Sequence, residues 1–384
     1  MIELKNLYKS YRGKSVLMNI SLTIQDNEFF VLIGSSGCGK TPLLKTLNKL
    51  NPIDKGEILI NGTPINRIKV TQLPRLMGYV VQEGGLFPHM TVEDNIALAM
   101  RVAGYPKEKI YDRITELLEL VNLEPDQYRS QYPSQLSGGQ RQRIGVARAF
   151  AADPEIILMD EPFSALDPMT RAELQDEVHR LQLRFHKTIV FVTHDMDEAV
   201  KLADRICILQ NGHVVQCDKP ENILKHPANE YINSFIGKNR LWENPSFIRA
   251  EDIMRPRPIT ISQSRTVVQA VQLMRHYNID SLLVTGDDNK FAGMVWLQDL
   301  IGIDQYSSPV SSFLSDDYLS VRVDDSLSTV LEKVADYGEK DFGILPVLDA
   351  EGAIRGFLNR SSLLSTLSRR FIDEPVERDE QEGA

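Results

Sequence analysis

The sequence has little of what would place a protein outside the reducing interior of a cell. Its 384 residues include only three cysteines, Cys38, Cys207 and Cys217, which are too few and too odd in number for a disulfide framework. No apolar run approaches the roughly 20 residues that a membrane-spanning helix needs. The first residues also lack the basic stretch and apolar core of a signal peptide. We therefore expect a cytoplasmic protein that acts on a membrane only through partners.

Positive charge is also scarce. Lysine and arginine together number 43 against 53 aspartates and glutamates, so the formal net charge is −10. A nucleic-acid-binding protein normally carries a basic stripe, and this balance argues against a nucleic-acid partner. The seven histidines are scattered without the spacing of metal ligands, so no histidine-based metal cluster is expected.

Apolar residues, in contrast, are abundant enough for more than one core. They make up 42% of the chain and charged residues 25%, which are ordinary values, and the length predicts two or three domains. Strand-like and helix-like segments alternate up to residue 237, which is typical of an α/β fold. Strands are predicted at Phe29–Ile33, Met77–Val81, Ile156–Met159, Thr188–Val192 and Ile206–Leu209, and helices at Lys107–Val121 and Arg171–Phe185.

A polar linker at residues 238–249 ends this part, and the chain after it repeats itself. Val267 and Gly293 recur at the same spacing as Val330 and Gly356. Each copy is predicted to run strand, helix, strand, tight turn, strand, helix. Two copies are too few for a solenoid, so we expect a paired α+β module that buries its faces against itself.

The most informative motif is a glycine-rich turn between the predicted strand Phe29–Ile33 and a helix-like segment. In this context the turn is a phosphate cradle, because the glycines let backbone N–H groups converge on phosphate oxygens at a helix N-terminus. Lys40 is expected to reach the β- and γ-phosphates of a nucleotide, and the Thr41 hydroxyl to help hold Mg²⁺. The cradle consists of Gly34, Ser35, Ser36, Gly37, Cys38, Gly39, Lys40 and Thr41.

Two acidic residues follow the buried strand predicted at Ile156–Met159. Asp160 and Glu161 come at its C-terminal end, where open α/β sheets place their ligands. Asp160 is suited to orient Mg²⁺ through water, and Glu161 to polarise the water that attacks the γ-phosphate. Beside a phosphate cradle, this pair favours nucleotide hydrolysis over two acids that merely face solvent.

A second anion site is predicted at the start of the helix-like segment Arg141–Phe150, where backbone N–H groups are unpaired. The residues that introduce it are Ser137, Gly138, Gly139 and Gln140. Together with the cradle, this motif is highly specific for one family of ATP-binding proteins. Residues 1–237 resemble the ATP-binding subunits of ABC transporters, with ATP and Mg²⁺ as the implied cofactors.

The resemblance implies roles for further residues. Gln82 matches the Q-loop glutamine that contacts Mg²⁺ and senses the γ-phosphate, and Asp167 lies in the D-loop sequence. His194 matches the switch histidine that grips the γ-phosphate. Tyr11 resembles the aromatic residue that stacks on adenine, although Tyr8 could take that place.

The resemblance also implies a homodimer in which two chains pair head to tail. The Ser137–Gln140 motif of one chain then completes the nucleotide site of the other, so that ATP joins the two subunits.

One residue departs from the family pattern, because Pro42 replaces the usual serine or threonine and removes a backbone N–H near the α-phosphate. Cys38, at a helix N-terminus, is expected to have a lowered pKa and high reactivity, so that a maleimide blocks turnover and ATP protects.

The repeated module resembles a tandem pair of CBS domains, over residues 250–306 and 307–369, before an acidic tail at 370–384 that we expect to be disordered. Such pairs commonly bind adenosine-containing ligands, and cyclic di-AMP is the candidate that the resemblance suggests. Of the family's ribose-binding pattern only Asp299 is carried over, because Trp296 replaces the threonine and the second copy lacks the acid. Two alternatives stay open: the module only dimerises the subunits, or it senses ionic strength on anionic lipid, which its acidic balance opposes.

An ABC ATPase followed by CBS domains resembles the quaternary-amine uptake family. The implied function is ATP hydrolysis that energises import of glycine betaine, carnitine, choline or proline betaine as an osmoprotectant. The implied partners are integral-membrane permease subunits, which dock just after the Q-loop, and a substrate-binding protein, with the ATPase peripheral on the cytoplasmic face of the membrane. The rivals are a non-transport ABC ATPase, which typically has two cassettes or long coiled-coil insertions, and a nucleotide sensor with an inert ATPase.

Overall fold

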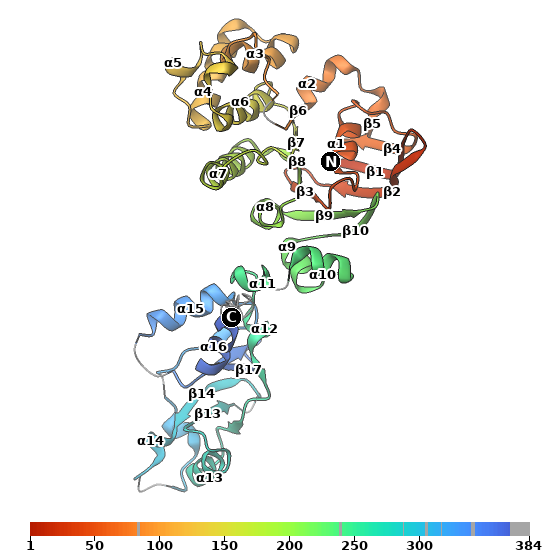
Figure 1. Cartoon of the computed structure of the whole chain (residues 1–384). Coiled ribbons are helices and arrows are strands. Elements are labelled where there is room, and N and C mark those ends of the chain that lie inside the picture. The colour runs from red at the N-terminus through yellow and green to blue at the C-terminus, as the bar shows by residue number, and fades with distance from the viewer. Residues whose placement is uncertain are drawn as a thin grey trace, which may run out of the picture. The chain divides into compact units, whose positions relative to one another are not determined.

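The computed structural model describes residues 1–82, 85–237, 240–286, 288–303, 306–315, 317–338 and 342–368. These residues form two compact units, Met1–Ile236 and Gly237–Ala384 (Figure 1). The predicted acidic tail, and Glu83 and Gly84 after the Q-loop glutamine, lie outside the described residues. No helix in the described part of the chain has both the length and the apolar character to span a bilayer.

The first unit is built on a mainly parallel sheet with the strand order β10-β9-β3-β8-β7-β6. Its parallel members pair in register, and only β10 runs antiparallel, at the edge. β3, β7 and β8 are buried along their whole length, which explains why they read as continuous apolar runs. The bounds are β3 Phe29–Ile33, β6 Met77–Val80, β7 Ile156–Asp160, β8 Thr188–Thr193, β9 Arg205–Gln210 and β10 His213–Asp218.

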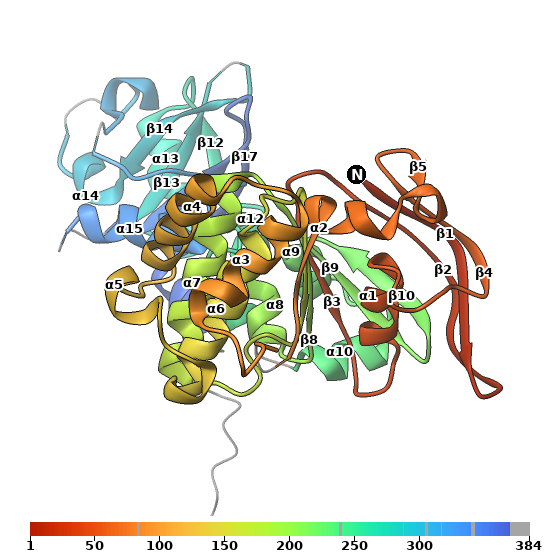
Figure 2. The ribbon, with the colours of Figure 1, turned by 90° about the horizontal axis from the view of Figure 1, so that it is seen from above.

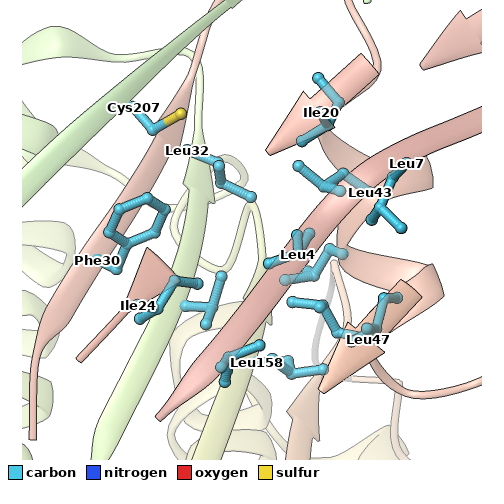
Figure 3. Packing of buried hydrophobic residues seen from close by; sticks show 14 of the residues in the cluster. Leu4, Leu7, Ile20, Ile24, Phe30, Leu32, Leu43, Leu47, Leu158 and Cys207 are labelled. Atoms are coloured by element: carbon cyan, nitrogen blue, oxygen red, sulfur yellow. The ribbon is translucent and has the colours of Figure 1, made fainter. Parts of the chain in front are cut away.

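A second, antiparallel sheet has the order β2-β1-β4-β5. The sequence reading did not predict it. Its strands are β1 Ile2–Tyr11, β2 Lys14–Ile24, β4 Lys55–Ile60 and β5 Thr63–Pro64. Helix α1, Lys40–Leu47, packs its apolar side chains into the core between the two sheets. Figure 3 shows this core, with contributions from Leu4, Leu7 and Ile20 of the antiparallel sheet, Phe30, Leu32, Leu158 and Cys207 of the parallel sheet, and Leu43 and Leu47 of α1.

The remaining helices of this unit lie around the parallel sheet. α3 packs against both α4 and α6, and Figures 1 and 2 show this group on the opposite side of the parallel sheet from the antiparallel strands. Two helices begin earlier than predicted, because Ser137 caps α6 and Asp167 caps α7. The bounds are α2 Leu73–Leu76, α3 Val92–Val102, α4 Lys107–Leu120, α5 Pro125–Tyr128, α6 Gly138–Phe150, α7 Pro168–Phe185, α8 Met196–Leu202, α9 Pro220–Lys225 and α10 Glu230–Ile236.

The second unit contains the predicted repeat. Each copy has a parallel strand–helix–strand and then an antiparallel hairpin and a helix, which confirms the predicted order of elements and the α/β then α+β fold class. The first copy has β12 Thr260–Ser262, α13 Val267–Tyr277, β13 Ser281–Thr285, β14 Phe291–Trp296 and α14 Leu297–Leu300. The second copy has β15 Val321–Arg322, α15 Leu327–Asp336, β16 Ile344–Leu348, β17 Ile354–Asn359 and α16 Arg360–Ser368. The segments α11 Arg240–Glu243, α12 Ala250–Ile253 and β11 Arg255–Pro256 precede them.

Packing in this unit does not follow the repeat. β11 pairs with β17, and Ile248 and Ala250 are buried in the core of the second copy. In return, Val310 and Phe313, which precede the second copy, pack into the core of the first. Each copy therefore receives the segment that leads into the other, and the two copies form one interlocked body.

Candidate functional site

The phosphate cradle lies between β3 and α1, at the carboxyl end of the parallel sheet. The loop approaches its neighbours so closely that a Cβ at Gly34 would lie 2.2 Å from the Leu209 carbonyl oxygen. Gly39 has φ 111°, a left-handed conformation that favours glycine. Lys40 is only 5% exposed, and its Nζ donates to the carbonyl oxygens of Gly34 at 2.7 Å and Ser35 at 3.2 Å. The ammonium group is thus held inside the curve of the loop.

Pro42 is the third residue of α1 and leaves the helix intact. A backbone N–H at this position is among the first four of a helix, which have no partner within it. The first helical hydrogen bond runs from the Leu43 N–H to the Gly39 carbonyl at 2.9 Å. The Cys38 carbonyl, four residues before Pro42, accepts instead from the Gly212 N–H at 3.1 Å. The proline therefore removes a backbone N–H that could face a ligand. It does not remove a hydrogen bond that the fold uses.

The prediction of a lowered pKa for Cys38 is wrong. Its side chain is buried in the apolar core beneath the loop and is only 4% exposed. Burial raises the pKa of the Cys38 thiol, and the nearby Lys40 charge lowers it by less. The helix N-terminus does not compensate for the loss of water, so this thiol has neither the access nor the ionisation that rapid maleimide labelling requires.

A hydroxyl and a carboxylate meet beside the cradle. Thr41 Oγ1 donates to Asp160 Oδ1 at 2.7 Å, and the Tyr79 hydroxyl donates to Asp160 Oδ2 at 3.4 Å. Burial and the negative charge of Asp160 raise the pKa of Tyr79 far above its ordinary value, so the phenol stays a donor. One carboxylate and one hydroxyl fit Mg²⁺, which takes few protein ligands and completes its shell with phosphate and water. The described residues contain no group of three or more His, Cys, Asp or Glu side chains that could hold a metal alone.

Glu161 and His194 come together at the ends of β7 and β8. Glu161 Oε2 lies 3.3 Å from His194 Nδ1, and the histidine side chain is 61% exposed. Glu161 has φ 47°, a left-handed conformation that is uncommon for a residue with a side chain. Its N–H donates to the Val192 carbonyl at 3.0 Å, which fixes this turn against β8. Such strain is held by the surrounding structure and is frequent at functional sites.

Gln82 reaches the same region from the end of β6. Its Nε2 donates to Ser164 Oγ at 3.4 Å, and that hydroxyl donates to the Glu161 carbonyl at 3.1 Å. The glutamine is thus joined through Ser164 to the backbone of the predicted base. Cradle, acids, glutamine and histidine all follow the carboxyl ends of β3, β7, β6 and β8, which are neighbours in the sheet.

The sequence reading missed two residues that connect these loops. Arg171 Nη2 donates to the Leu166 carbonyl at 3.1 Å, while Arg171 Nη1 lies 3.6 Å from Asp195 Oδ2. Glu198 is buried, which raises its pKa, and it accepts from Thr193 Oγ1 at 2.6 Å. Arg171 therefore joins the D-loop to the residue after His194. Its position inside a predicted helix gave no sign of this.

The second anion motif forms a complete helix cap. The Ser137 N–H donates to Gln140 Oε1 at 2.9 Å and the Gln140 N–H donates to Ser137 Oγ at 3.2 Å. A Cβ at Gly139 would lie 2.7 Å from Thr170 Cγ2, so this glycine lets α6 start against the first turn of α7. Among the described residues, no hydrogen bond or ion pair joins this motif to the phosphate cradle of the same chain.

Asp167 and Tyr11 lie at the edges of this arrangement. Asp167 Oδ1 accepts from the Thr170 N–H at 3.1 Å, and hydrogen bonding to Thr170 lowers the pKa of Asp167. Tyr11 is 39% exposed at the tip of the β1–β2 hairpin, with Lys9 Nζ 5.2 Å from its ring centroid. Tyr8 is equally exposed, so exposure does not distinguish the two rings.

In the second unit, Asp299 lines a cavity of about 500 Å³. Asp280, Asp317 and Tyr337 also line it, and Trp296 occupies the place of the family's threonine. The matching position in the second copy holds no acid. There the Asn359 N–H donates to Ser362 Oγ at 3.0 Å and the Ser362 N–H donates to Asn359 Oδ1 at 2.8 Å, so both residues serve as a helix cap.

Profiles of two families match the chain: the one described as ABC transporter covers residues 17–164, and the one described as CBS domain covers 250–304 and 310–369. The chain is 44% identical over 367 residues to the choline transport ATP-binding protein OpuBA of Bacillus subtilis, covering 95% of both proteins. It is also 44% identical over 366 residues to the glycine betaine/carnitine/choline transport ATP-binding protein OpuCA of the same organism, again with 95% of both covered.

Among solved structures, the first unit is similar to the dimeric structure of MJ0796, a bacterial ABC transporter cassette. The TM-score is 0.53 and the identity 33%, with 57% of this chain and 99% of the cassette covered. A post-hydrolysis state of the same cassette, bound to ADP and Pi, gives the same values.

Proposed function

The chain belongs to the ATP-binding subunits of ABC transporters for quaternary-amine osmoprotectants, and from this we propose that it hydrolyses ATP to drive the import of such an amine through partner permease subunits. The proposal depends chiefly on one observation. The Thr41–Asp160 pair and the Glu161–His194 pair follow adjacent strands of one parallel sheet, beside a loop that encloses Lys40. The related proteins are named for choline, carnitine and glycine betaine, so their names give the class of solute and not one member.

We assign the steps of hydrolysis to this chain's own residues. Lys40 turns from the loop carbonyls to the β- and γ-phosphates, where its ammonium meets anionic oxygens in place of neutral ones. Thr41 and Asp160 would hold Mg²⁺, which would neutralise negative charge on the phosphates. Glu161 accepts a proton from the attacking water, and His194 donates to the γ-phosphate.

We infer that two chains sandwich the nucleotide, because the similar cassette MJ0796 is dimeric and the Ser137–Gln140 cap leaves backbone donors at the start of α6. The capped start of α6 presents backbone donors to the nucleotide of a second chain. Asp167 and the adjoining Met169, which is highly exposed, lie beside it and suit the interface.

An apolar groove next to the Q-loop is suited to dock the permease. It has a volume of about 430 Å³, and Phe87, Leu98 and Val102 are among its lining residues. Phe87 is 42% and Val102 60% exposed, and exposed apolar side chains gathered in one groove mark an interaction site. A coupling segment of a membrane subunit would bury this surface, which accounts for the peripheral attachment of the ATPase.

Val102→Glu is expected to prevent co-purification with the permease subunits, since burying a carboxylate in an apolar interface costs free energy. Solute-stimulated ATPase activity in liposomes should fall with it, while nucleotide binding by the free subunit stays unchanged. Leu183→Glu is the matched control, because Leu183 is an exposed apolar residue of α7 that does not line the groove. Normal assembly of the Val102→Glu protein would contradict the docking proposal. A wild-type complex that no quaternary amine stimulates would contradict the function itself.

Pro42→Thr is expected to tighten ATP binding roughly fivefold. The threonine restores an N–H and a hydroxyl near the α-phosphate, and one net hydrogen bond contributes about 1 kcal/mol. Titration with a fluorescent ATP analogue would measure the change, with Pro52→Thr in the exposed turn after α1 as the control. If affinity and turnover do not change, the missing donors are unimportant.

For the CBS pair we propose an adenine-nucleotide regulator bound in the cavity that Asp299 lines, with its ribose on the Asp299 carboxylate. Calorimetry of the full chain with cyclic di-AMP should give a binding isotherm, and Asp299→Ala should weaken the affinity by roughly tenfold or more. Asp324→Ala, at an exposed turn, is the control. If neither cyclic di-AMP nor AMP gives heat or a thermal shift, dimerisation is the role of the module that is left.

A further inference from the structure

Two of the three cysteines face each other across the antiparallel edge of the parallel sheet. Cys207 of β9 is directly opposite Cys217 of β10, so both side chains lie on the same face. Opposed residues of an antiparallel pair have Cα atoms about 4.5–5.5 Å apart. That separation lies within the roughly 4.4–6.8 Å that a disulfide spans. The register of the two strands therefore places both cysteines where a disulfide can form without a change of strand pairing.

The two thiols have different surroundings. Cys207 is fully buried beside Leu32, as Figure 3 shows, whereas Cys217 is half-buried at the sheet edge. Arg205 Nη2 donates to Cys217 Sγ at 3.2 Å. The hydrogen bond with Cys207 lowers the pKa of Cys217, and the Arg205 charge adds to this against the cost of burial. The same hydrogen bond, together with burial, raises the pKa of Cys207.

We propose that Cys217 and Cys207 form an oxidisable dithiol, in which Cys217 is the attacking thiol, Cys207 resolves the intermediate, and a hydroperoxide is the oxidant. The Cys217 thiolate attacks the terminal peroxide oxygen, the O–O bond breaks, and the leaving oxygen takes up a proton, which gives water from hydrogen peroxide and an alcohol from an organic hydroperoxide. Cys217 is then a sulfenic acid. Cys207 attacks its sulfur, the S–S bond forms, and the hydroxyl leaves with the Cys207 proton as water. Two thiols lose two electrons in total, and one peroxide gains them.

This pair lies on the hairpin that contacts the start of α1. At the turn of the hairpin the Gly212 N–H donates to the Cys38 carbonyl at 3.1 Å, and the Gly212 carbonyl accepts from the Met18 N–H at 2.8 Å. A disulfide between β9 and β10 would pin the strands that carry these contacts. Cytosolic disulfides are usually transient and redox-sensing, which fits a pair at a sheet edge beside the nucleotide site.

The test uses the reduced full-length protein and hydrogen peroxide. Intact mass should fall by two hydrogens, and peptide mapping should find Cys207 joined to Cys217, with recovery after dithiothreitol. Cys217→Ser should abolish the disulfide and slow peroxide consumption roughly tenfold or more. Cys207→Ala should halt at a Cys217 sulfenic acid that a cyclic diketone traps.

Three results would overturn the proposal. They are a wild-type mass that peroxide leaves unchanged, a disulfide that contains Cys38, and oxidation of Cys207 at the wild-type rate in Cys217→Ser. Cys217→Ser changes a half-buried residue. The test with this variant is therefore valid even if the core does not tolerate Cys207→Ala.

Discussion

Replacing Glu161 with glutamine should slow ATP hydrolysis by about 10²- to 10⁴-fold while leaving ATP binding intact. A general base contributes that range, and glutamine keeps the shape and the contact with His194 but cannot accept the proton. Because hydrolysis would no longer separate the subunits, the variant with Mg-ATP should accumulate as a dimer. Phosphate release would measure the rate, and light scattering the change of mass.

Glu155→Gln is the matched control for this experiment. Glu155 precedes the same strand, β7, at its opposite end, where it accepts from Asn61 Nδ2 at 2.9 Å. The same chemical change there should leave turnover within about twofold, since it alters only an exposed pair. Unaltered hydrolysis in Glu161→Gln would refute the assignment of Glu161 as the base. A hydrolysis-dead protein that stays monomeric with saturating ATP would refute the nucleotide sandwich.

Lys40→Ala should weaken ATP binding by roughly a hundredfold. Hydrogen bonds from a charged group contribute about 1.5–3 kcal/mol each, and Lys40 has an ammonium directed into the curve of the loop. Isothermal titration calorimetry with a non-hydrolysable ATP analogue and Mg²⁺ would measure the loss, and turnover should fall with it.

Lys45→Ala provides the comparison, because Lys45 lies further along the same helix and away from the loop. It should retain wild-type affinity. Circular dichroism of both variants would show that α1 is still formed. Affinity within threefold of wild type in a folded Lys40→Ala protein would mean that the loop backbone alone holds the phosphates, contrary to the proposal.

The sequence predicted the parallel sheet well, because strands buried on both faces leave continuous apolar runs such as Phe29–Ile33 and Thr188–Val192. It did not predict the antiparallel sheet. Strands there mix buried and exposed positions irregularly, as in Ile2–Tyr11, whose pairing with β2 contains register shifts. Local pattern cannot distinguish such strands from loops, since long-range pairing decides them.

At the candidate site, the sequence pointed to those residues whose spacing along the chain forms a motif. The residues that the sequence reading missed act across loops. Arg171 joins the D-loop to Asp195 only because α7 and α8 lie together. Cys38 shows the opposite kind of error. Its place at a helix start suggested a reactive thiol, but its side chain is buried in the apolar core, where its pKa is raised. The burial of one cysteine depends on the elements packed around it and does not follow from its place at a helix start.

The crossing of segments in the second unit sets a condition on how this chain can change. A gene shortened after residue 306 would lose Val310 and Phe313, and with them part of the wall of the half that remained. That half would also keep Ile248 and Ala250 with nothing left to cover them. A chain cut at this point loses part of the core of the half that remains, so we expect it to be less stable unless other side chains take the places of Val310 and Phe313.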